Sequence, residues 1–225
     1  MKKFLLFLLT AWGCLSVNFA YADKQPQTDK EKFSYAVGIQ LTENILRQSI
    51  QVDTEAFIQA IRDVLNNTEM KLTRNEIQEI LANYQKQQQT LQTLQAQKNK
   101  AAGDKFLAAN RTKDGVVELP SGLQYKVISK GDGKKPSIDD NVLVHYRGTL
   151  LNGKEFDSSY KRGEPITLSL KNVIKGWQEA LTMMGVGSKW QIYVPAKLAY
   201  GQQAAGPDIQ ANSALIFDIE LIAIN

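Results

Sequence analysis

The sequence predicts an α+β protein in which an antiparallel sheet packs one face on a short helix, with an all-helical region in front. Three observations carry this prediction. Apolar residues follow helical spacing over residues 29–110, and they alternate with a period of two from Val116 onward. One convincing helix, which contains Trp177, interrupts the alternating segments. Later strands are predicted at residues 166–170, 189–195 and 214–224.

The spacing predicts two amphipathic helices before residue 73. One apolar stripe has members four residues apart, and a second stripe follows it. Asp53 is placed to cap the second helix. The first stripe contains Phe33, Val37, Leu41 and Ile45, and the second contains Phe57, Ile58, Ile61, Val64 and Leu65.

A third helix is predicted over residues 73–110. Thr73-Arg74-Asn75-Glu76 matches a capping box, and neither proline nor glycine follows before Gly103. At 1.5 Å per residue such a helix is a rod of roughly 55 Å. We expect its early turns to pack on the first two helices and its glutamine-rich part to stand in water as a spacer. The alternative is a polar linker without stable structure.

The helical region is expected to form a homodimer through residues 23–110. Two short helices and part of a third make a thin core, and small domains bury too little surface to be stable on their own. The predicted organisation is a signal peptide (1–22), a helical dimerisation domain (23–72), a long connecting helix (73–110) and a β-rich domain (116–225).

The N-terminus predicts export. A basic tip precedes a short apolar run at residues 4–9, well below the roughly 20 residues that a membrane span needs. Ala20-Tyr21-Ala22 has the small-x-small pattern of signal-peptide cleavage, so the mature chain is expected to begin at Asp23. Two alternatives stay open: lipidation at Cys14, for which Trp12 makes a poor context, and an uncleaved membrane anchor.

Composition excludes several classes of chemistry. The expected mature chain retains 25 basic and 23 acidic residues, a formal charge of +2, and no cysteine. Thiol catalysis, disulfides and cysteine-ligated zinc are therefore excluded. His145 is the single histidine, which makes a Ser-His-Asp triad or a multi-histidine metal site hard to assemble. The near-neutral charge gives no nucleic-acid footprint. We expect no metal, no cofactor and no nucleic-acid partner.

Three local patterns resemble functional motifs but have simpler explanations. Residues 148–155 nearly match a P-loop, but Glu155 stands where Ser or Thr must hold magnesium, and Asn152-Gly153 predicts a hairpin turn. We therefore expect no nucleotide binding. No histidine or lysine signature stands near Asp157-Ser158-Ser159 to activate a serine, so turn chemistry explains these residues. His145 is expected to be a sheet residue without catalytic duty.

Four separated stretches carry a family resemblance. They are "VLVHYRGTLLNGKEFDSSYKRGEPITLSL", "NVIKGWQEAL", "VPAKLAYG" and "LIFDIELI". In sequence and spacing they closely resemble the FKBP-type peptidyl-prolyl cis-trans isomerases, over about residues 116–225. The whole chain is similar to the bacterial exported MIP-like and FkpA-like subfamily. The resemblance implies a strongly twisted sheet wrapped round the Trp177 helix and a homodimer through the N-terminal helices. It also implies a location in the periplasm, or at the outer membrane or cell surface, of a Gram-negative bacterium.

The resemblance also implies residue roles. Trp177 would form the floor beneath the substrate proline, while the Tyr200 hydroxyl and the Ile174 backbone N–H would donate to substrate carbonyls. Asp157 would face the twisting amide, paired with Arg162 or hydrogen-bonded to Tyr146. The implied catalytic residues are Tyr146, Phe156, Asp157, Trp177, Tyr200 and Phe217, and the implied substrate-binding residues are Arg162, Ile166, Leu168, Val173, Ile174 and Ile209.

The chemistry of X-Pro rotation agrees with this composition. The barrier, about 18–20 kcal/mol, arises because amide resonance must be broken. No proton or group is transferred, so no side chain that titrates near neutrality is needed. A dry aromatic pocket stabilises the planar, charge-separated amide less than water does, while fixed groups can favour the twisted amide.

Two departures from the family pattern concern the rim of the implied pocket. Ile166 and Leu168 stand where many relatives have an aromatic residue, and the segment "QQAAGPDIQAN" carries Asp208 in a small, apolar tip. The implied ligands are proline-containing unfolded or nascent polypeptides and macrolide inhibitors of the rapamycin class, whose affinity depends on this rim. The leading hypothesis is an exported isomerase that assists protein folding. The alternatives are a holdase chaperone with weak isomerase activity and a surface protein that interacts with a host.

Overall fold

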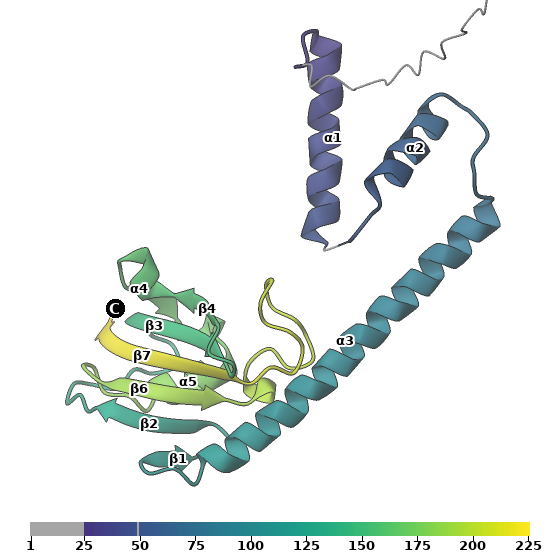
Figure 1. Cartoon of the computed structure of the whole chain (residues 1–225). Coiled ribbons are helices and arrows are strands. Elements are labelled where there is room, and N and C mark those ends of the chain that lie inside the picture. The colour runs from purple at the N-terminus through teal and green to yellow at the C-terminus, as the bar shows by residue number, and fades with distance from the viewer. Residues whose placement is uncertain (1–24, 49) are drawn as a thin grey trace, which may run out of the picture. The chain divides into compact units, whose positions relative to one another are not determined.

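The computed structural model describes residues 25–48 and 50–225 (Figure 1). The predicted signal peptide, its cleavage site and the alternatives at Cys14 lie outside the described residues. The chain divides after Thr73 into a helical unit and a larger unit that begins at Arg74.

Two capped helices make up the helical unit. α1 (Asp29–Arg47) begins after Thr28, whose hydroxyl accepts from the Glu31 N–H at 3.2 Å while the Glu31 carboxylate accepts from the Thr28 N–H at 2.8 Å. This capping box satisfies amides that the helix leaves unpaired. α2 (Thr54–Leu65) begins after Asp53, whose carboxylate accepts from the third helical N–H at 2.9 Å. The predicted cap at Asp53 is confirmed, and the box at Thr28 is an addition from the structure.

The apolar side chains of α1 and α2 remain uncovered within the helical unit. In the described part of the chain no residue of α1 is buried, and Phe33 and Leu65 are 71% and 78% exposed. An open groove of about 560 Å³ lies between the helices. Its lining is almost wholly apolar: Phe33, Ser34, Val37, Gly38, Leu41, Phe57, Ala60, Ile61, Val64 and Leu65.

The larger unit opens with the long helix α3 (Arg74–Asn110), which ends where the sequence predicts. Its last turns pack on the sheet of the same unit (Figure 1). The rings of Phe106 and Tyr193 lie 5.9 Å apart, and the buried Asn110 donates from Nδ2 to Oε1 of Gln124 at 3.0 Å. These turns therefore pack on the sheet, a contact that the sequence does not predict. Packing of the first turns on α1 and α2 stays a prediction.

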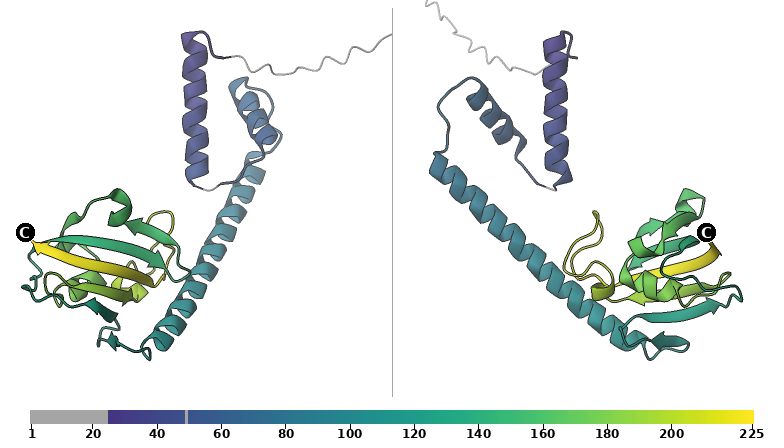
Figure 2. Two further views of the ribbon diagram at one scale, coloured as in Figure 1. Left: turned by 60° about the vertical axis from the view of Figure 1, so that its left-hand side comes forward. Right: turned by 180° about the vertical axis from the view of Figure 1, so that it is seen from behind.

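Seven strands of the described chain form one antiparallel sheet in the order β1-β2-β6-β7-β3-β4, with β5 paired to β3 (Figure 2). The strands are β1 (Val116–Glu118), β2 (Gln124–Ser129), β3 (Asn141–Leu150), β4 (Glu155–Ser158), β5 (Ile166–Ser169), β6 (Lys189–Val194) and β7 (Leu215–Ile224). The short helices between them are α4 (Ser159–Arg162), η1 (Leu170–Asn172), α5 (Lys175–Leu181) and η2 (Ala196–Leu198). The long strand β3 pairs with β7 on one edge and with β5 and then β4 on the other.

One face of the sheet packs on α5 and forms the core. Period-two alternation sends every second residue of β3 and β7 to this face. The buried residues of these strands include Val142, Val144, Tyr146, Leu215, Phe217, Ile219 and Leu221, and those of α5 are Gly176, Trp177, Ala180 and Leu181. The predicted α+β class, an antiparallel sheet around a short helix, is confirmed. Within the described residues no helix has both the length and the apolar character to cross a membrane.

A short hairpin loop of residues 151–153 joins β3 to β4, at the place where Asn152-Gly153 predicts a hairpin. The Gly153 N–H donates to the Leu150 carbonyl at 2.9 Å, and the Leu150 N–H donates to the Lys154 carbonyl at 2.9 Å. Gly153 has φ 84°, a left-handed conformation that glycine adopts without strain. The near match to a P-loop is therefore a hairpin, and no helix begins there.

Candidate active site

Six segments of the larger unit converge on a cavity of about 250 Å³. They are β3, β4, β5, the segment from η1 into α5, the turn after η2, and β7. The cavity is lined by Tyr146, Phe156, Asp157, Leu168, Asn172, Val173, Ile174, Trp177, Tyr200 and Phe217. Nine of the residues implied by sequence resemblance therefore lie together, although they span more than 70 positions of the chain.

Trp177 forms an aromatic cluster with its neighbours at this cavity. The residue is 4% exposed, and its ring meets Tyr146 edge to face, with centroids 5.2 Å apart and planes at 81°. Phe217 makes the same kind of contact with Trp177 at 5.3 Å, and Phe156 meets Phe217 at 5.6 Å. Such arrangements are the favoured geometry of aromatic pairs. The aromatic surface is consequently held by packing on several sides.

Two glycines permit this close packing. A Cβ atom on Gly176 would lie 2.6 Å from Cγ1 of Val194, so only glycine lets the start of α5 approach β6. A Cβ atom on Gly148 would lie 2.6 Å from Phe156 and 2.9 Å from Phe217. Gly176 thus allows close packing at the start of α5. Gly148 has the same role beneath two aromatic rings, which the sequence does not reveal.

Asp157 is held by two donors. The Tyr146 hydroxyl donates a very short hydrogen bond to its Oδ2, and Nη1 of Arg162 contacts its Oδ1 at 2.5 Å. Arg162 also donates from Nη2 to the Tyr146 hydroxyl oxygen at 2.8 Å. Pairing with Arg162 and hydrogen bonding to Tyr146, offered by the sequence as alternatives, occur together.

These contacts determine the charge of each group. Burial raises the pKa of Tyr146, and its hydrogen bond to Asp157 raises this pKa further. Burial alone would raise the pKa of Asp157 as well, but the hydrogen bonds from Tyr146 and Arg162 outweigh burial and lower it. The same bonds to Asp157 and Tyr146 raise the pKa of Arg162. Near neutral pH the site therefore holds a neutral phenol, a carboxylate and a guanidinium.

Ser159 supports the backbone of Tyr146 at the edge of β3. The buried Ser159 hydroxyl oxygen accepts from the Tyr146 N–H at 2.8 Å and lies 3.2 Å from the Tyr146 carbonyl oxygen, continuing the β3 ladder just beyond the end of β4. Nδ1 of His145 lies 2.9 Å from the same hydroxyl, and its ring stacks on Tyr160 at 4.5 Å. His145 thus lies outside the cavity lining.

The segment before α5 presents a free donor. Nε2 of Gln178 donates to the Val173 carbonyl at 3.1 Å, which braces this segment. The Ile174 carbonyl accepts from the Trp177 N–H at 2.9 Å, whereas the Ile174 N–H has no acceptor among the described residues. Tyr200, which also lines the cavity, is 42% exposed.

Three of the implied residues do not line the cavity. Arg162 acts on it through Asp157 and Tyr146, Ile209 is buried in the core, and Ile166 packs against the core. Their contacts with substrate stay predictions. Asn172 is a lining residue that the sequence offers no signal to find.

The comparisons with known proteins agree with this geometry. Residues 132–222 match the family model described as "FKBP-type peptidyl-prolyl cis-trans isomerase", and residues 30–127 match "Domain amino terminal to FKBP-type peptidyl-prolyl isomerase". The chain belongs to the FKBP-type peptidyl-prolyl cis-trans isomerase family.

Relatives of this FKBP-type isomerase align along most of its length. It is 42% identical over 201 residues to outer membrane protein MIP of Legionella longbeachae, which covers 88% of this chain and 86% of the relative. It is 42% identical to peptidyl-prolyl cis-trans isomerase Mip of Coxiella burnetii, with 100% and 99% covered. Among solved structures, FkpA of Escherichia coli matches with a TM-score of 0.64 at 35% identity, covering 88% of this chain and 98% of that one.

The protein is therefore an enzyme that catalyses rotation about X-Pro bonds, as its sequence resemblance implies. The comparisons give the holdase and host-interaction alternatives no support over this activity.

Proposed function

We propose that this FKBP-type isomerase twists the X-Pro bond in the cavity above Trp177, with the proline ring on the indole and the amide facing Asp157. The observation that carries the proposal is the meeting of an aromatic surface with a fixed carboxylate in one cavity of about 250 Å³. The cavity provides the apolar surface and the fixed charge that this rotation needs. The rotation itself requires no proton transfer.

The apolar lining would lower the barrier by changing the surroundings of the amide. Resonance places negative charge on the carbonyl oxygen of the planar form, and water stabilises that charge. Aromatic walls replace this water, so breaking resonance costs less in the cavity. Each 1.36 kcal/mol gained by the twisted amide relative to the planar amide raises the rate about tenfold.

Asp157 would act as a fixed negative charge. Tyr146 and Arg162 occupy one carboxylate oxygen each, which holds the group in place and ionised. A carboxylate beside the substrate carbonyl repels the charge that resonance puts on the carbonyl oxygen. It therefore disfavours the planar amide more than the twisted one, in which that charge is smaller.

Two donors would hold the substrate backbone while the bond turns. The Ile174 N–H is unpaired among the described residues, and Tyr200 is a second residue of the cavity lining that carries a donor. Hydrogen bonds from both to substrate carbonyls would fix the chain on either side of the proline. Rotation would then be confined to the one amide, which lowers its entropic cost.

An isomerisation assay on a short proline peptide tests this assignment. Asp157→Ala should lower kcat/KM by at least about tenfold, because a fixed charge at the reacting amide is lost. The matched control is Asp139→Ala, which removes an exposed carboxylate paired with Lys171 and should keep wild-type activity. Wild-type activity in Asp157→Ala would show that the carboxylate has no part in the reaction.

We also propose that the protein is a homodimer through residues 23–110. The uncovered apolar groove between α1 and α2 supports this, since a second copy would remove that surface from water. The match of residues 30–127 to the amino-terminal domain model agrees with a distinct role for this region.

The substrates we propose are proline-containing unfolded or nascent polypeptides in the cell envelope, whose folding the enzyme would assist. A location in the periplasm or at the outer membrane is supported by the predicted signal peptide and by the printed name of the Legionella relative. Rapamycin-class macrolides are proposed ligands of the same cavity, with Ile166, Leu168 and Ile209 at its rim. Cell fractionation with periplasmic and outer-membrane markers tests the location.

A further inference from the structure

A closed loop comes directly after one of the residues that line the cavity. This rim loop, residues 201–212, begins directly after Tyr200. The Asn212 N–H donates to the Gly201 carbonyl at 2.7 Å and closes its base, where Asn212 adopts φ 59°. Within the loop, the Ala205 N–H donates to the Ile209 carbonyl at 2.8 Å. Tyr200 and the buried Ile209 are thus held by the geometry of one loop.

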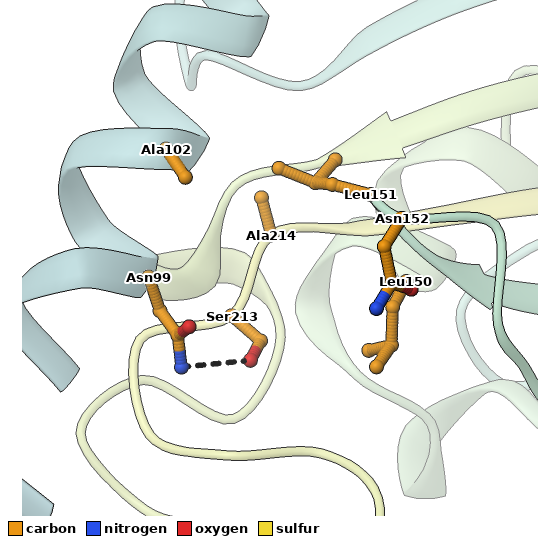
Figure 3. A pocket seen from close by; sticks show the side chains of 7 residues that line it. All are labelled: Asn99, Ala102, Leu150, Leu151, Asn152, Ser213 and Ala214. Atoms are coloured by element: carbon orange, nitrogen blue, oxygen red, sulfur yellow. Dashed lines mark hydrogen bonds between the residues drawn. The ribbon is translucent and has the colours of Figure 1, made fainter. Parts of the chain in front are cut away.

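The long helix α3 forms hydrogen bonds with the base of this loop. Nδ2 of Asn99 donates to the Ala211 carbonyl at 2.9 Å and lies 3.5 Å from the Ser213 hydroxyl, the contact drawn in Figure 3. From the loop side, Nδ2 of Asn212 donates to the Ala96 carbonyl at 3.4 Å. The helix and the loop therefore exchange hydrogen bonds in both directions.

Two further features make this contact specific. Nε2 of Gln95 donates to Oδ1 of Asn99 at 2.9 Å, which leaves the amide NH₂ to face the loop. At Gly103 the helix passes so close that an added Cβ would lie 3.2 Å from Cβ of Ala214. In Figure 3 the side chains of Asn99 and Ala102 project from α3 toward Ser213 and Ala214.

The outer part of the rim loop has a separate attachment. Nζ of Lys154, in the β3–β4 hairpin, contacts Oδ1 of Asp208 at 2.6 Å. Both side chains are partly exposed, so solvent screens this ion pair and it contributes little. The part-buried amide contacts at the base are the stronger restraint, because backbone carbonyls there have a direct donor.

We propose that Asn99 is a positioning residue for the isomerase reaction. From α3 it holds the base of the rim loop and so fixes Tyr200, which lines the cavity, and Ile209, which anchors the loop in the core. The inference rests on the proposed site above Trp177. By this inference α3, the first helix of the larger unit, contributes to substrate binding.

The effect should appear in KM more than in kcat. Tyr200 and Ile209 would contact the substrate in its planar and its twisted forms alike, and loss of such uniform binding raises KM while leaving kcat nearly unchanged. Asn99→Ala in the full-length chain should raise KM about threefold to tenfold, the size expected for one positioned hydrogen bond. Asn99→Asp should raise KM at least as much, because it keeps the side-chain size but turns an oxygen toward the Ala211 carbonyl.

The experiment measures kcat and KM on a proline tetrapeptide together with amide hydrogen exchange. Exchange should accelerate at the amides of Ala205, Ile209 and Asn212 and stay at wild-type rates in β3 and β7. Gln97→Ala, an exposed change on the same helix, is the matched control and should alter neither quantity. Gln95→Ala, which frees the Asn99 amide, should shift both in the same direction by less, and it decides the matter if a change at Asn99 prevents folding.

The experiment distinguishes failure of the Asn99 inference from failure of the proposed site. Unchanged KM and unchanged loop exchange in an active, folded Asn99→Ala chain overturn the role of Asn99 alone. Faster exchange throughout the sheet overturns it too, because the change would then be a general loss of stability. A wild-type chain that leaves the peptide at its uncatalysed rate overturns the proposed site and this inference with it.

Discussion

Nη1 of Arg162 lies 2.5 Å from Oδ1 of Asp157, five residues earlier in the chain. This contact and the hydrogen bond from Tyr146 keep the pKa of Asp157 below its ordinary value. A cation at the edge of the cavity thereby keeps a carboxylate charged within it.

The pH dependence of the enzyme should reflect this pairing. Because the folded-state pKa of Asp157 is lowered, kcat/KM should be flat between about pH 6 and 8. It should fall only below the ordinary pKa of aspartate, which is about 4. The stability that Asp157 contributes is present above its unfolded pKa and is lost as the pH falls through its folded pKa. Arg162→Gln should move the acid-side fall of kcat/KM to higher pH. Lys161→Gln should not move it, because Lys161 pairs with Glu155 and not with Asp157. A bell-shaped profile centred near neutrality would contradict the assignment.

Trp177 should matter for activity beyond its part in the core. Trp177→Phe keeps an aromatic ring but narrows the indole surface, so kcat/KM should fall severalfold. Trp190→Phe is the matched control, since Trp190 is also buried and stacks on Tyr125 at 4.3 Å, yet does not line the cavity. Both changes should lower the free energy of unfolding by about 1–3 kcal/mol, measured by urea denaturation. Equal losses of activity in the two variants would remove the special role of Trp177.

Gly176 should be intolerant of any side chain. A Cβ atom there would lie 2.6 Å from Val194, so Gly176→Ala should lower the free energy of unfolding by about 1–3 kcal/mol through overpacking. Adding Val194→Ala should relieve the contact and recover part of the loss. Denaturant melts that show no loss in Gly176→Ala would refute the packing argument.

The dimer should depend on the groove between α1 and α2. Val64 is 66% exposed within the chain, so Val64→Glu should cost little in a monomer but should place an unpaired charge in a dimer interface. Light scattering should give a dimer mass for the wild type and a monomer mass for Val64→Glu. Gln40→Glu, an exposed change outside the groove lining, should remain dimeric.

A truncated chain gives an independent check of the dimer. The division of the chain favours a start at Arg74, because a start at Val116 would remove the fully buried Asn110 and expose the core. The chain from Arg74 should be monomeric and keep isomerase activity on a short peptide. A dimer mass for this chain would place the interface outside α1 and α2.

Local patterns were sufficient for most of the secondary structure. Strands predicted at residues 166–170, 189–195 and 214–224 occur at Ile166–Ser169, Lys189–Val194 and Leu215–Ile224. The Asn152-Gly153 turn and the Asp53 cap were also predictable, since each depends on the chemistry of one or two residues. The family resemblance extended this to the cavity, because its motifs keep their spacing.

Other features depend on contacts between distant residues, which no local pattern encodes. Gly148 makes room for Phe156 and Phe217, and the Ser159 hydroxyl replaces a strand partner for Tyr146. Neither role has a signal in spacing or composition, because each arises only where β3 meets neighbouring segments of the folded chain. The same holds for Asn172, which enters the cavity lining through the path of the chain between β5 and α5.

The sequence by itself determined the order of helices and strands, the amphipathic faces that need a partner, and the family to which the enzyme belongs. These follow from periodicity, turn chemistry and motif spacing, which are local properties of the chain. The tertiary structure alone decided that Arg162 and Tyr146 hold Asp157 together, and that Asn99 reaches the loop beside Tyr200. The reason is physical: hydrogen bonds between residues up to 116 positions apart exist only once packing has brought the donor and the acceptor within hydrogen-bonding distance.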